Sequence, residues 1–247
     1  HFDFMPLIFS KLIDVPMVTT IHGFSSPKIV PVYKKYDSVV RYVSISDANR
    51  HPDLNYIATV YNGIDPKYFT FKEEPGGYLL FLGRIHHDKG TREAISIARK
   101  AGLPLLIAGI IQDQAYFNRF VKPEIDGRRI RFLGEAGPDQ RNRLLGGALA
   151  LLHPINFDEP FGLSVAESML CGTPVIAFRR GSMPELIRES ETGFLVTSIE
   201  EAVEKVKDLS KTPELIDRRK CHTWAKSMFT VDTMIHAYLE VYKKILH

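Results

Sequence analysis

The chain has 247 residues, of which 45% are hydrophobic and 25% are charged, and its formal net charge is +3 at pH 7. This composition is ordinary for a globular protein, and the charge is too small to indicate binding to nucleic acid. Two cysteines, Cys171 and Cys221, are too few for a disulfide framework or a metal cluster and fit a reducing compartment, so we expect a cytoplasmic protein. Peripheral association with a membrane and the oligomeric state both stay open at this point.

The first 70 residues contain three short segments rich in β-branched residues, which predict strands. The elements expected here are a helix at 4–13, strands at 16–21, 38–45 and 57–61, a helix near 28–36, and a short helix capped by Ser46 and Asp47. Ser25-Ser26-Pro27 is expected to interrupt the chain. Because a complete doubly wound domain has about five or six strands, residues 1–70 are predicted to form an incomplete first domain.

A polar stretch at 67–77, which includes Pro75-Gly76-Gly77, is predicted to be a linker. Beyond it, predicted strands and helices alternate, which is typical of a parallel sheet covered by helices on both faces. The expected strands are 78–82, 104–108, 129–133, 148–152, 174–178 and 193–196, and the expected helices are 92–101 (capped by Thr91), 112–122, 139–146, 163–171 and 184–189. The sequence therefore predicts an α/β fold, with a second Rossmann-like domain at 71–228.

The last 50 residues are predicted to be helical. Ser198 and Glu201 form a capping box, the pair Thr212-Pro213 begins another helix, and Thr230 begins the last one. The last helix carries a wide apolar stripe of Met234, Ile235, Tyr238, Val241, Tyr242 and Ile245. Such a stripe needs a partner surface, so the segment 229–247 is expected to dock on another part of the chain.

The most informative stretch follows the predicted strand at 148–152. A turn containing Glu159 leads to Gly162, and a helix bearing Glu167 begins there. Ligands of open α/β sheets bind at the carboxyl ends of parallel strands, and the N–H groups at a helix start attract anions. We therefore expect Glu159 and Glu167 to hold hydroxyl groups on either side of a bound phosphate.

The loop at 83–90 also joins a predicted strand to a predicted helix. Arg84 and Lys89 in this loop could hold a diphosphate without a metal ion, although a plain solvated loop is the alternative. His22 ends a predicted strand and is either a structural residue or an active-site residue. The sequence shows no spacing typical of metal ligands and no dinucleotide-binding glycine pattern. His86 and His87 are interpreted as loop residues, and His153 as shaping the entry to the turn.

The run from Glu159 to Ala177 resembles the signature of the retaining family 4 glycosyltransferases of the GT-B fold, in which seven residues separate two glutamates. Further segments are similar to other parts of that family, namely the diphosphate loop at 83–90, the glycine-rich turn at 181–185, the end of the first domain at 62–65, and the strand end with the active-site histidine at 20–23. The first strands of the family and its glycine-rich first loop have no counterpart here.

The resemblance implies two Rossmann-like, doubly wound parallel-sheet domains, the first of them incomplete, with a nucleotide sugar between them and a last helix that returns to the first domain. The implied donor-binding residues are Gly83, Arg84 and Lys89 at the diphosphate, Glu167 at the ribose, and Glu159 with the backbone of Phe161, Gly162 and Leu163 at the sugar. His22 would face the sugar from the first domain. The implied catalytic residues are Glu159, His22, Arg84 and Lys89.

The expected activity is transfer of a sugar from a nucleotide-diphosphate sugar, UDP- or GDP-linked, to an acceptor that the sequence does not identify. Retention of the anomeric configuration and independence of metal ions and cofactors are implied by the resemblance. Two alternatives remain, a nucleotide-binding fragment or inactive homologue without transfer activity, and a nucleotide-sugar epimerase of the same fold. The spacing of Glu159 and Glu167 favours the transferase.

Overall fold

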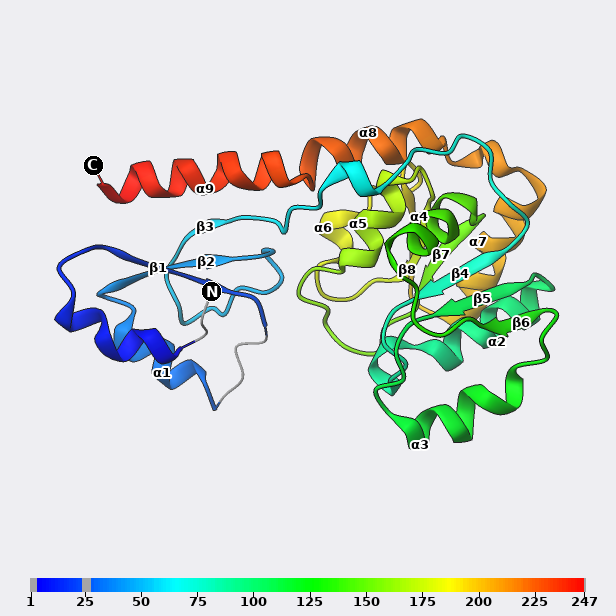
Figure 1. Cartoon of the computed structure of the whole chain (residues 1–247), viewed down its shortest axis with the longest axis horizontal. Helices are drawn as coiled ribbons and strands as arrows, with labels where there is room; N and C mark the ends of the chain where they lie inside the picture. Colours follow the sequence, from blue (N-terminus) through cyan, green and yellow to red (C-terminus); the bar gives the residue numbers. More distant parts are fainter. Residues whose placement is uncertain (1–3, 24–27, 247) are drawn as a thin grey trace.

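The computed structural model describes residues 4–23 and 28–246, so the predicted interruption at Ser25-Ser26-Pro27 lies outside the described residues. The described residues form two lobes, each built around its own parallel sheet, which confirms the predicted α/β class (Figure 1). We call the described residues up to 64, together with the last helix, the first lobe, and residues 65–228 the second lobe. None of the helices in the described ranges has the length and apolar character needed to span a membrane.

The sheet of the first lobe has, among the described residues, three parallel strands in the order β1-β2-β3. Its elements are the 3-10 helix η1 (Met5–Leu12), β1 (Met17–Ile21), α1 (Val30–Tyr36), β2 (Val40–Ser44) and β3 (Tyr56–Thr59). Tyr42 and Tyr33 form the centre of a small core, and the Tyr42 hydroxyl donates a hydrogen bond of 2.7 Å to the Tyr33 carbonyl.

The prediction of a short helix after Ser46 is wrong, because residues 45–49 form a turn. The Ser46 hydroxyl accepts a hydrogen bond from the Asn49 amide at 3.1 Å, as a helix cap would. However, the Asn49 side chain donates to the carbonyl of Ile21 at 3.0 Å, which ties the turn to the neighbouring strand. Side-chain bonds of this kind replace the backbone bonds of a helix.

The sheet of the second lobe has six parallel strands, within the described residues, in the order β6-β5-β4-β7-β8-β9. The strands are β4 (Leu79–Leu82), β5 (Leu105–Ala108), β6 (Ile130–Phe132), β7 (Ala150–His153), β8 (Val175–Phe178) and β9 (Gly193–Val196). The direction in which strands are added reverses between β4 and β7. Ligands of doubly wound sheets bind at such a switch point, outside the carboxyl ends of the strands.

Helices cover this sheet. They are α2 (Thr91–Ala101), α3 (Gln114–Tyr116), α4 (Pro138–Gly147), α5 (Leu163–Leu170), α6 (Met183–Leu186), α7 (Ile199–Lys211) and α8 (Arg218–Met228). The helix predicted at 112–122 instead divides into α3, a π-helical turn η4 (Phe117–Val121) and a 3-10 turn η5 (Lys122–Glu124) that contains Pro123. Proline removes a backbone donor, which helps to end the regular helix.

Two predicted helix starts need correction, while the one at Ser198 is confirmed. Gly90, not Thr91, caps α2, because the chain enters the helix through a left-handed residue at which a Cβ atom would lie 1.8 Å from the Pro154 carbonyl oxygen. The pair Thr212-Pro213 begins only a 3-10 turn, η6 (Pro213–Leu215), and α8 begins after the cap Asp217. Ser198 caps α7 as predicted, accepting from the Glu201 amide at 3.1 Å.

The chain passes between the lobes twice, and the two passages lie side by side. The Ile64 amide donates to the Phe229 carbonyl at 2.8 Å, and the Val231 amide donates to the Ile64 carbonyl at 3.0 Å. A Cβ atom at Gly63 would lie 2.6 Å from the Cα of Val231, so the close approach requires glycine. The next segment, with η2 (Pro66–Tyr68), is not a free linker, because the Lys72 and Gly76 amides donate to carbonyls of the second lobe.

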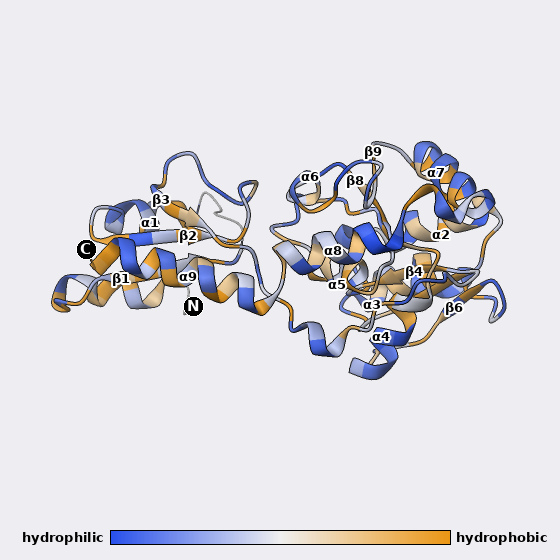
Figure 2. Ribbon diagram, turned by 90° about the horizontal axis from the view of Figure 1, so that it is seen from above, coloured by the Kyte–Doolittle hydropathy of each residue, from blue (hydrophilic) through white to orange (hydrophobic). Residues whose placement is uncertain are grey.

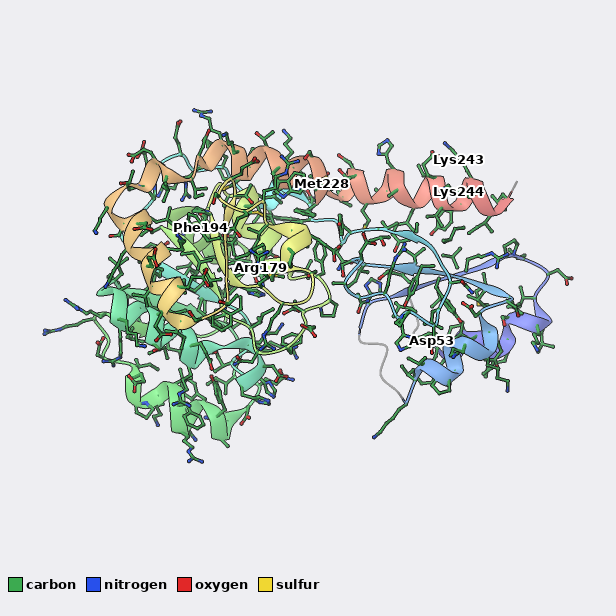
Figure 3. The ribbon with its side chains drawn as sticks, turned by 180° about the vertical axis from the view of Figure 1, so that it is seen from behind. Asp53, Arg179, Phe194, Met228, Lys243 and Lys244 are labelled. Carbon is green, nitrogen blue, oxygen red and sulfur yellow. The ribbon has the colours of Figure 1, made fainter. Side chains whose placement is uncertain are left out.

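The last helix, α9 (Val231–Leu246), lies over the strands of the first sheet, as Figure 2 shows from above. Val241 is buried against Val43 and Val60, and Tyr238 shares a hydrogen bond of 2.7 Å with the Thr20 hydroxyl. Ile235 and Tyr242, which also belong to the predicted stripe, are 47% and 44% exposed, so the docked stripe is narrower than the sequence indicates. Figure 3 shows Met228 near the junction of α8 with α9, and Lys243 and Lys244 at the far end of α9.

Arg218 at the start of α8 is a buried structural residue that the sequence did not single out. Its guanidinium donates to the carbonyls of Lys72, Ala148 and Gly146 and to the Thr173 hydroxyl, at 2.7–3.0 Å. Burial lowers the pKa of Arg218. The residue thereby joins the incoming segment at Lys72 to the end of α4 and to the turn before β8.

Replacement of this residue should be costly. We expect Arg218→Leu to lower the free energy of unfolding by about 3 kcal/mol, because the buried carbonyls of Gly146 and Ala148 and the buried Thr173 hydroxyl lose their donor. Urea unfolding followed by circular dichroism measures the loss. Arg219→Leu is the matched control, since its guanidinium pairs with Glu73 at 2.7 Å on the surface and such pairs contribute little. Equal losses for the two variants would contradict this role of Arg218.

Candidate functional site

A cavity of about 460 Å³ lies between the two lobes, beside the switch point of the second sheet. Cavities of this size are typical of small-molecule sites. The residues that line it include every site residue expected from the sequence, namely His22, Gly83, Arg84, Lys89, Glu159, Phe161, Gly162, Leu163 and Glu167. They are joined by residues that the sequence analysis did not assign to a site, among them Asn62, Glu135, Arg141 and His153.

Two loops at neighbouring strand ends contribute Lys89 and Glu159 to the wall. One follows β4 and contains η3 (His87–Lys89), and the other follows β7. Asn156 in the second loop joins them, since its amide donates to the Asp88 carbonyl at 2.7 Å and its side chain donates to the His87 carbonyl at 3.0 Å. The two loops are therefore fixed relative to each other before any ligand binds.

Lys89 and Glu159, predicted to bind different parts of one ligand, form an ion pair with each other. Each side chain is 14% exposed, and the Lys89 ammonium also lies over the Phe157 ring at 4.6 Å from its centroid. A partly buried pair is screened little by water, so each charge holds the other in place. A ligand that carries phosphate and hydroxyl groups can bind both the Lys89 ammonium and the Glu159 carboxylate.

His153, the last residue of β7, is buried next to the Glu159 side of this ion pair. It is 6% exposed, and its Nε2 atom is buried 3.9 Å from Glu159 Oε2, with no hydrogen-bond partner among the described residues. Burial lowers the pKa of His153 to about 4, with Glu159 opposing the shift, so the ring is neutral near pH 7. The sequence analysis gave His153 a structural role only, although its position at the carboxyl end of a buried strand was a usable signal.

Glu167 on α5 is 7% exposed and pairs with Arg141 of α4, whose Nη1 lies 3.0 Å from Glu167 Oε1. Burial raises the pKa of Glu167 to about 7, and Arg141 opposes that shift. Arg141 brings a third cation to the cavity. No motif in the sequence marks it, because only the packing of α4 beside α5 brings it to the site.

The other expected residues lie at the rim and at the helix start. Arg84 is exposed and donates to the Gln112 side chain at 2.8 Å, and His22 is exposed at the end of β1. Gly162 precedes α5 in a left-handed conformation with φ of 88°, and no side chain of the described residues caps that helix start. The start of α5 lies in the wall of the cavity, and uncapped amides at a helix start are suited to binding an anion.

Within the described ranges, one group of side chains has ligand atoms close enough together to hold a metal ion. It consists of the consecutive residues His86, His87 and Asp88, and His87 Nε2 lies 2.8 Å from Asp88 Oδ1. These residues are not among those that line the cavity. The absence of a metal from the reaction therefore stays a prediction.

Comparison with known proteins gives consistent matches. Residues 67–228 match the family described as Glycosyl transferases group 1. A glycogen synthase of Mycobacterium tuberculosis is 28% identical over 213 residues, which cover 74% of this chain and 51% of that protein. A D-inositol 3-phosphate glycosyltransferase of Corynebacterium efficiens is 32% identical over 128 residues, which cover 47% of this chain and 30% of that protein. The chain thus spans about half the length, or less, of these relatives.

Solved structures show the same fold. HepE of Anabaena, in complex with UDP and glucose, matches with a TM-score of 0.81 at 20% identity, covering 96% of this chain and 74% of that chain. Sucrose-phosphate synthase of Thermosynechococcus elongatus matches with a TM-score of 0.82 at 17% identity, and the match covers 97% of this chain and 70% of that chain. These likenesses concern the arrangement of both lobes, because they cover nearly all of this chain.

The raised pKa of Glu167 predicts a pH dependence of stability. Between pH 4.5 and about 7, the Glu167 carboxyl group is ionised in the unfolded chain but still largely protonated in the folded protein. The contribution of this group to the stability of the folded state therefore falls as the pH rises. We expect the contribution of Glu167 to fall by about 3 kcal/mol, at about 1.4 kcal/mol for each unit of pKa shift. It is measured as the difference in stability between the wild-type protein and Glu167→Gln, because the lowered pKa of His153 makes an opposite contribution over part of this range in both proteins. Glu167→Gln should remove this fall.

The measurement is urea unfolding of both proteins at several pH values across that range. Glu200→Gln is the control, since Glu200 is exposed and pairs with Lys100 on the surface. If the wild-type protein and Glu167→Gln show the same dependence on pH, the carboxyl group of Glu167 does not titrate in this window.

Proposed function

The chain belongs to the Glycosyl transferases group 1 family, and on that premise we propose that it transfers a sugar from a nucleotide-diphosphate sugar to an acceptor. Its fold is the GT-B type expected from the sequence. The observation that carries the proposal is the cavity between the lobes, which is lined by three glutamates, three cations and a helix start. Together these groups match the hydroxyls and the diphosphate of such a donor.

The donor is proposed to be linked to UDP or GDP. The UDP and glucose bound to the related fold of HepE support a uridine nucleotide. Arg84, Lys89 and the amides after Gly162 would bind the diphosphate. Glu167 would accept hydrogen bonds from the ribose hydroxyls, with Arg141 holding one of its oxygens.

Donor binding would exchange the ion pair between Lys89 and Glu159 for contacts to the ligand. The diphosphate attracts the Lys89 ammonium, and the released Glu159 carboxylate accepts from hydroxyls of the sugar. The backbone of Phe161 and Leu163 lies beside Glu159 in the same turn, and His22 faces the sugar from the first lobe. The ion pair between Lys89 and Glu159 is lost, but each side chain gains a contact to the ligand, so the charges of the site stay compensated.

The proposed chemistry depends on electrostatic stabilisation of the leaving group. Breaking the bond to the sugar leaves negative charge on the nucleotide diphosphate, and Arg84, Lys89 and the start of α5 stabilise that charge more in the transition state than in the ground state. These groups can supply the positive charge without a metal ion. We propose retention of the anomeric configuration, with a leaving-group oxygen taking the acceptor proton. Glu159 and Glu167 are then binding groups and not the acid-base pair of a glycosidase.

A second candidate, which the sequence analysis left open, is a nucleotide-binding protein without transfer activity. Calorimetry that detects nucleotide binding, combined with assays that detect no turnover of any donor, would support this candidate. Measured transfer of a sugar by the chain would exclude it.

Loss of the proposed phosphate-binding cations should slow the reaction. We expect Lys89→Ala and Arg84→Ala each to lower kcat by about 10²-fold, as removal of an oxyanion-type donor does. The measurement is release of nucleoside diphosphate in the presence of donor and acceptor. Lys100→Ala is the matched control, because Lys100 pairs with Glu200 on the surface. Wild-type rates in both site variants would contradict the roles assigned to Arg84 and Lys89.

The preferred nucleotide and the need for a metal can be tested together by thermal shift. At a concentration of about 100 times its dissociation constant, the cognate nucleotide should stabilise the protein by about 2.7 kcal/mol. UDP, GDP and ADP are compared, each with magnesium and with EDTA. We expect one of the uridine or guanosine nucleotides to raise Tm equally in both buffers. A shift that disappears in EDTA would contradict metal-free binding of the diphosphate.

A further inference from the structure

Glu185 on α6 connects the second lobe directly to the first. Its carboxylate accepts hydrogen bonds from the backbone amides of Asp47 and Ala48, at 2.8 and 2.6 Å, and from the Tyr61 hydroxyl at 3.1 Å. All three donors belong to the first lobe. Hydrogen bonds to an ionised acceptor are about twice as strong as those between neutral groups. Glu185 is thus a charged clamp between the lobes, and it does not line the cavity.

On the second lobe, the start of α6 is bonded to the turn that carries Glu159. The Ser182 amide donates to the Glu159 carbonyl at 3.0 Å, and the Ser182 hydroxyl donates to the Phe161 carbonyl at 2.8 Å. Gly181 makes this contact possible, since a Cβ atom there would lie 2.4 Å from the Glu159 amide nitrogen. The position of Glu185 therefore depends on the position of the Glu159 turn.

On the first lobe, the turn held by Glu185 is bonded to the strand end that carries His22. Asn49 follows Asp47 and Ala48, and its side chain donates to the Ile21 carbonyl at 3.0 Å. His22 is the next residue along the chain. Hydrogen bonds, linked by the short backbone segments 182–185 and 47–49, thus connect the Glu159 turn through Glu185 to the strand end next to His22.

We propose that Glu185 is an interdomain latch, a positioning residue that holds the wall of the cavity bearing His22 against the wall bearing Glu159. Without it, the lobes remain joined by the two chain passages near Ile64 and by the packing of Tyr61 on Phe161 and Phe229, all on the side of the junction. The donors to Glu185 are partly exposed to water, so the latch can open and close. Its effect on catalysis rests on the proposed function, but its effect on the spacing of the lobes does not.

The spacing of the lobes can be measured without any substrate. Spin labels are placed on Asp53→Cys in the first lobe and Lys207→Cys in the second, both at exposed positions. The native thiols of Cys171 and Cys221 are buried, and burial raises the pKa of each to about 12, so they react slowly with the label. Pulsed electron paramagnetic resonance then gives the distribution of distances between the two labels.

We expect one narrow distribution for the parent chain and a broader one, with added long distances, for Glu185→Gln. The substituted amide presents its NH₂ group to a backbone N–H, so one of the paired bonds is replaced by repulsion. Tyr61→Phe, which removes one of the three donors, should give an intermediate result. Glu191→Gln is the control, because Glu191 pairs with Arg188 on the surface of the second lobe. A distribution in Glu185→Gln equal to that of the parent would overturn the latch.

A kinetic measurement separates positioning from general damage. Because the proposed nucleotide contacts lie on the second lobe, Glu185→Gln should leave the Kd for UDP or GDP within about twofold of the parent. It should lower kcat/KM by about 10-fold to 10²-fold, as misplacement of a reacting group does. Unchanged kcat/KM would overturn the catalytic part of the inference. If the parent protein transfers no sugar, the proposed function fails, while the label distances still test the latch.

Discussion

Backbone hydrogen bonds between Ile64 and the residues Phe229 and Val231 hold the two interlobe passages together. Phe229 also packs edge-on against Tyr61 and Phe161, at centroid distances of 5.6 and 5.8 Å. The junction between the lobes is therefore in contact with the turn that lines the cavity. If the passages separated, the cavity would lose its opposite wall, so its shape depends on this small backbone contact and on the aromatic cluster around it.

Four of the charged side chains of the cavity form two compensated ion pairs. Lys89 faces Glu159, and Arg141 faces Glu167, while His153 is kept neutral by burial beside the first pair. An unpaired charge at these depths would be unstable, so each acid needs a partner when no ligand is present. The same pairing keeps the groups oriented toward one space. A ligand with its own charges and hydroxyls can replace each partner without leaving a buried charge alone.

Several expectations at the ends of elements were wrong for local physical reasons. The helix after Ser46 is missing because Asn49 bonds to the neighbouring strand, and Thr91 is not a cap because close packing against Pro154 requires the left-handed glycine before it. The stretch at 67–77 resembles a linker in composition, yet its amides bond to the second lobe through Lys72 and Gly76. In each case a contact with a distant residue decided between local alternatives that the sequence alone leaves nearly equal.

The sequence by itself determined the α/β class, most of the order of strands and helices, the placement of Arg84, Lys89 and Glu159 in loops after strands, and that of Glu167 on the following helix. It could do so because hydrophobic periodicity and turn residues act over a few neighbouring positions. Only the tertiary structure decided that Arg141 meets Glu167, that His153 lies behind Glu159, and that Glu185 joins the lobes. Glu185 and Ala48 are 137 positions apart. No local pattern specifies such a contact, since it forms only when two separately folded sheets are brought together.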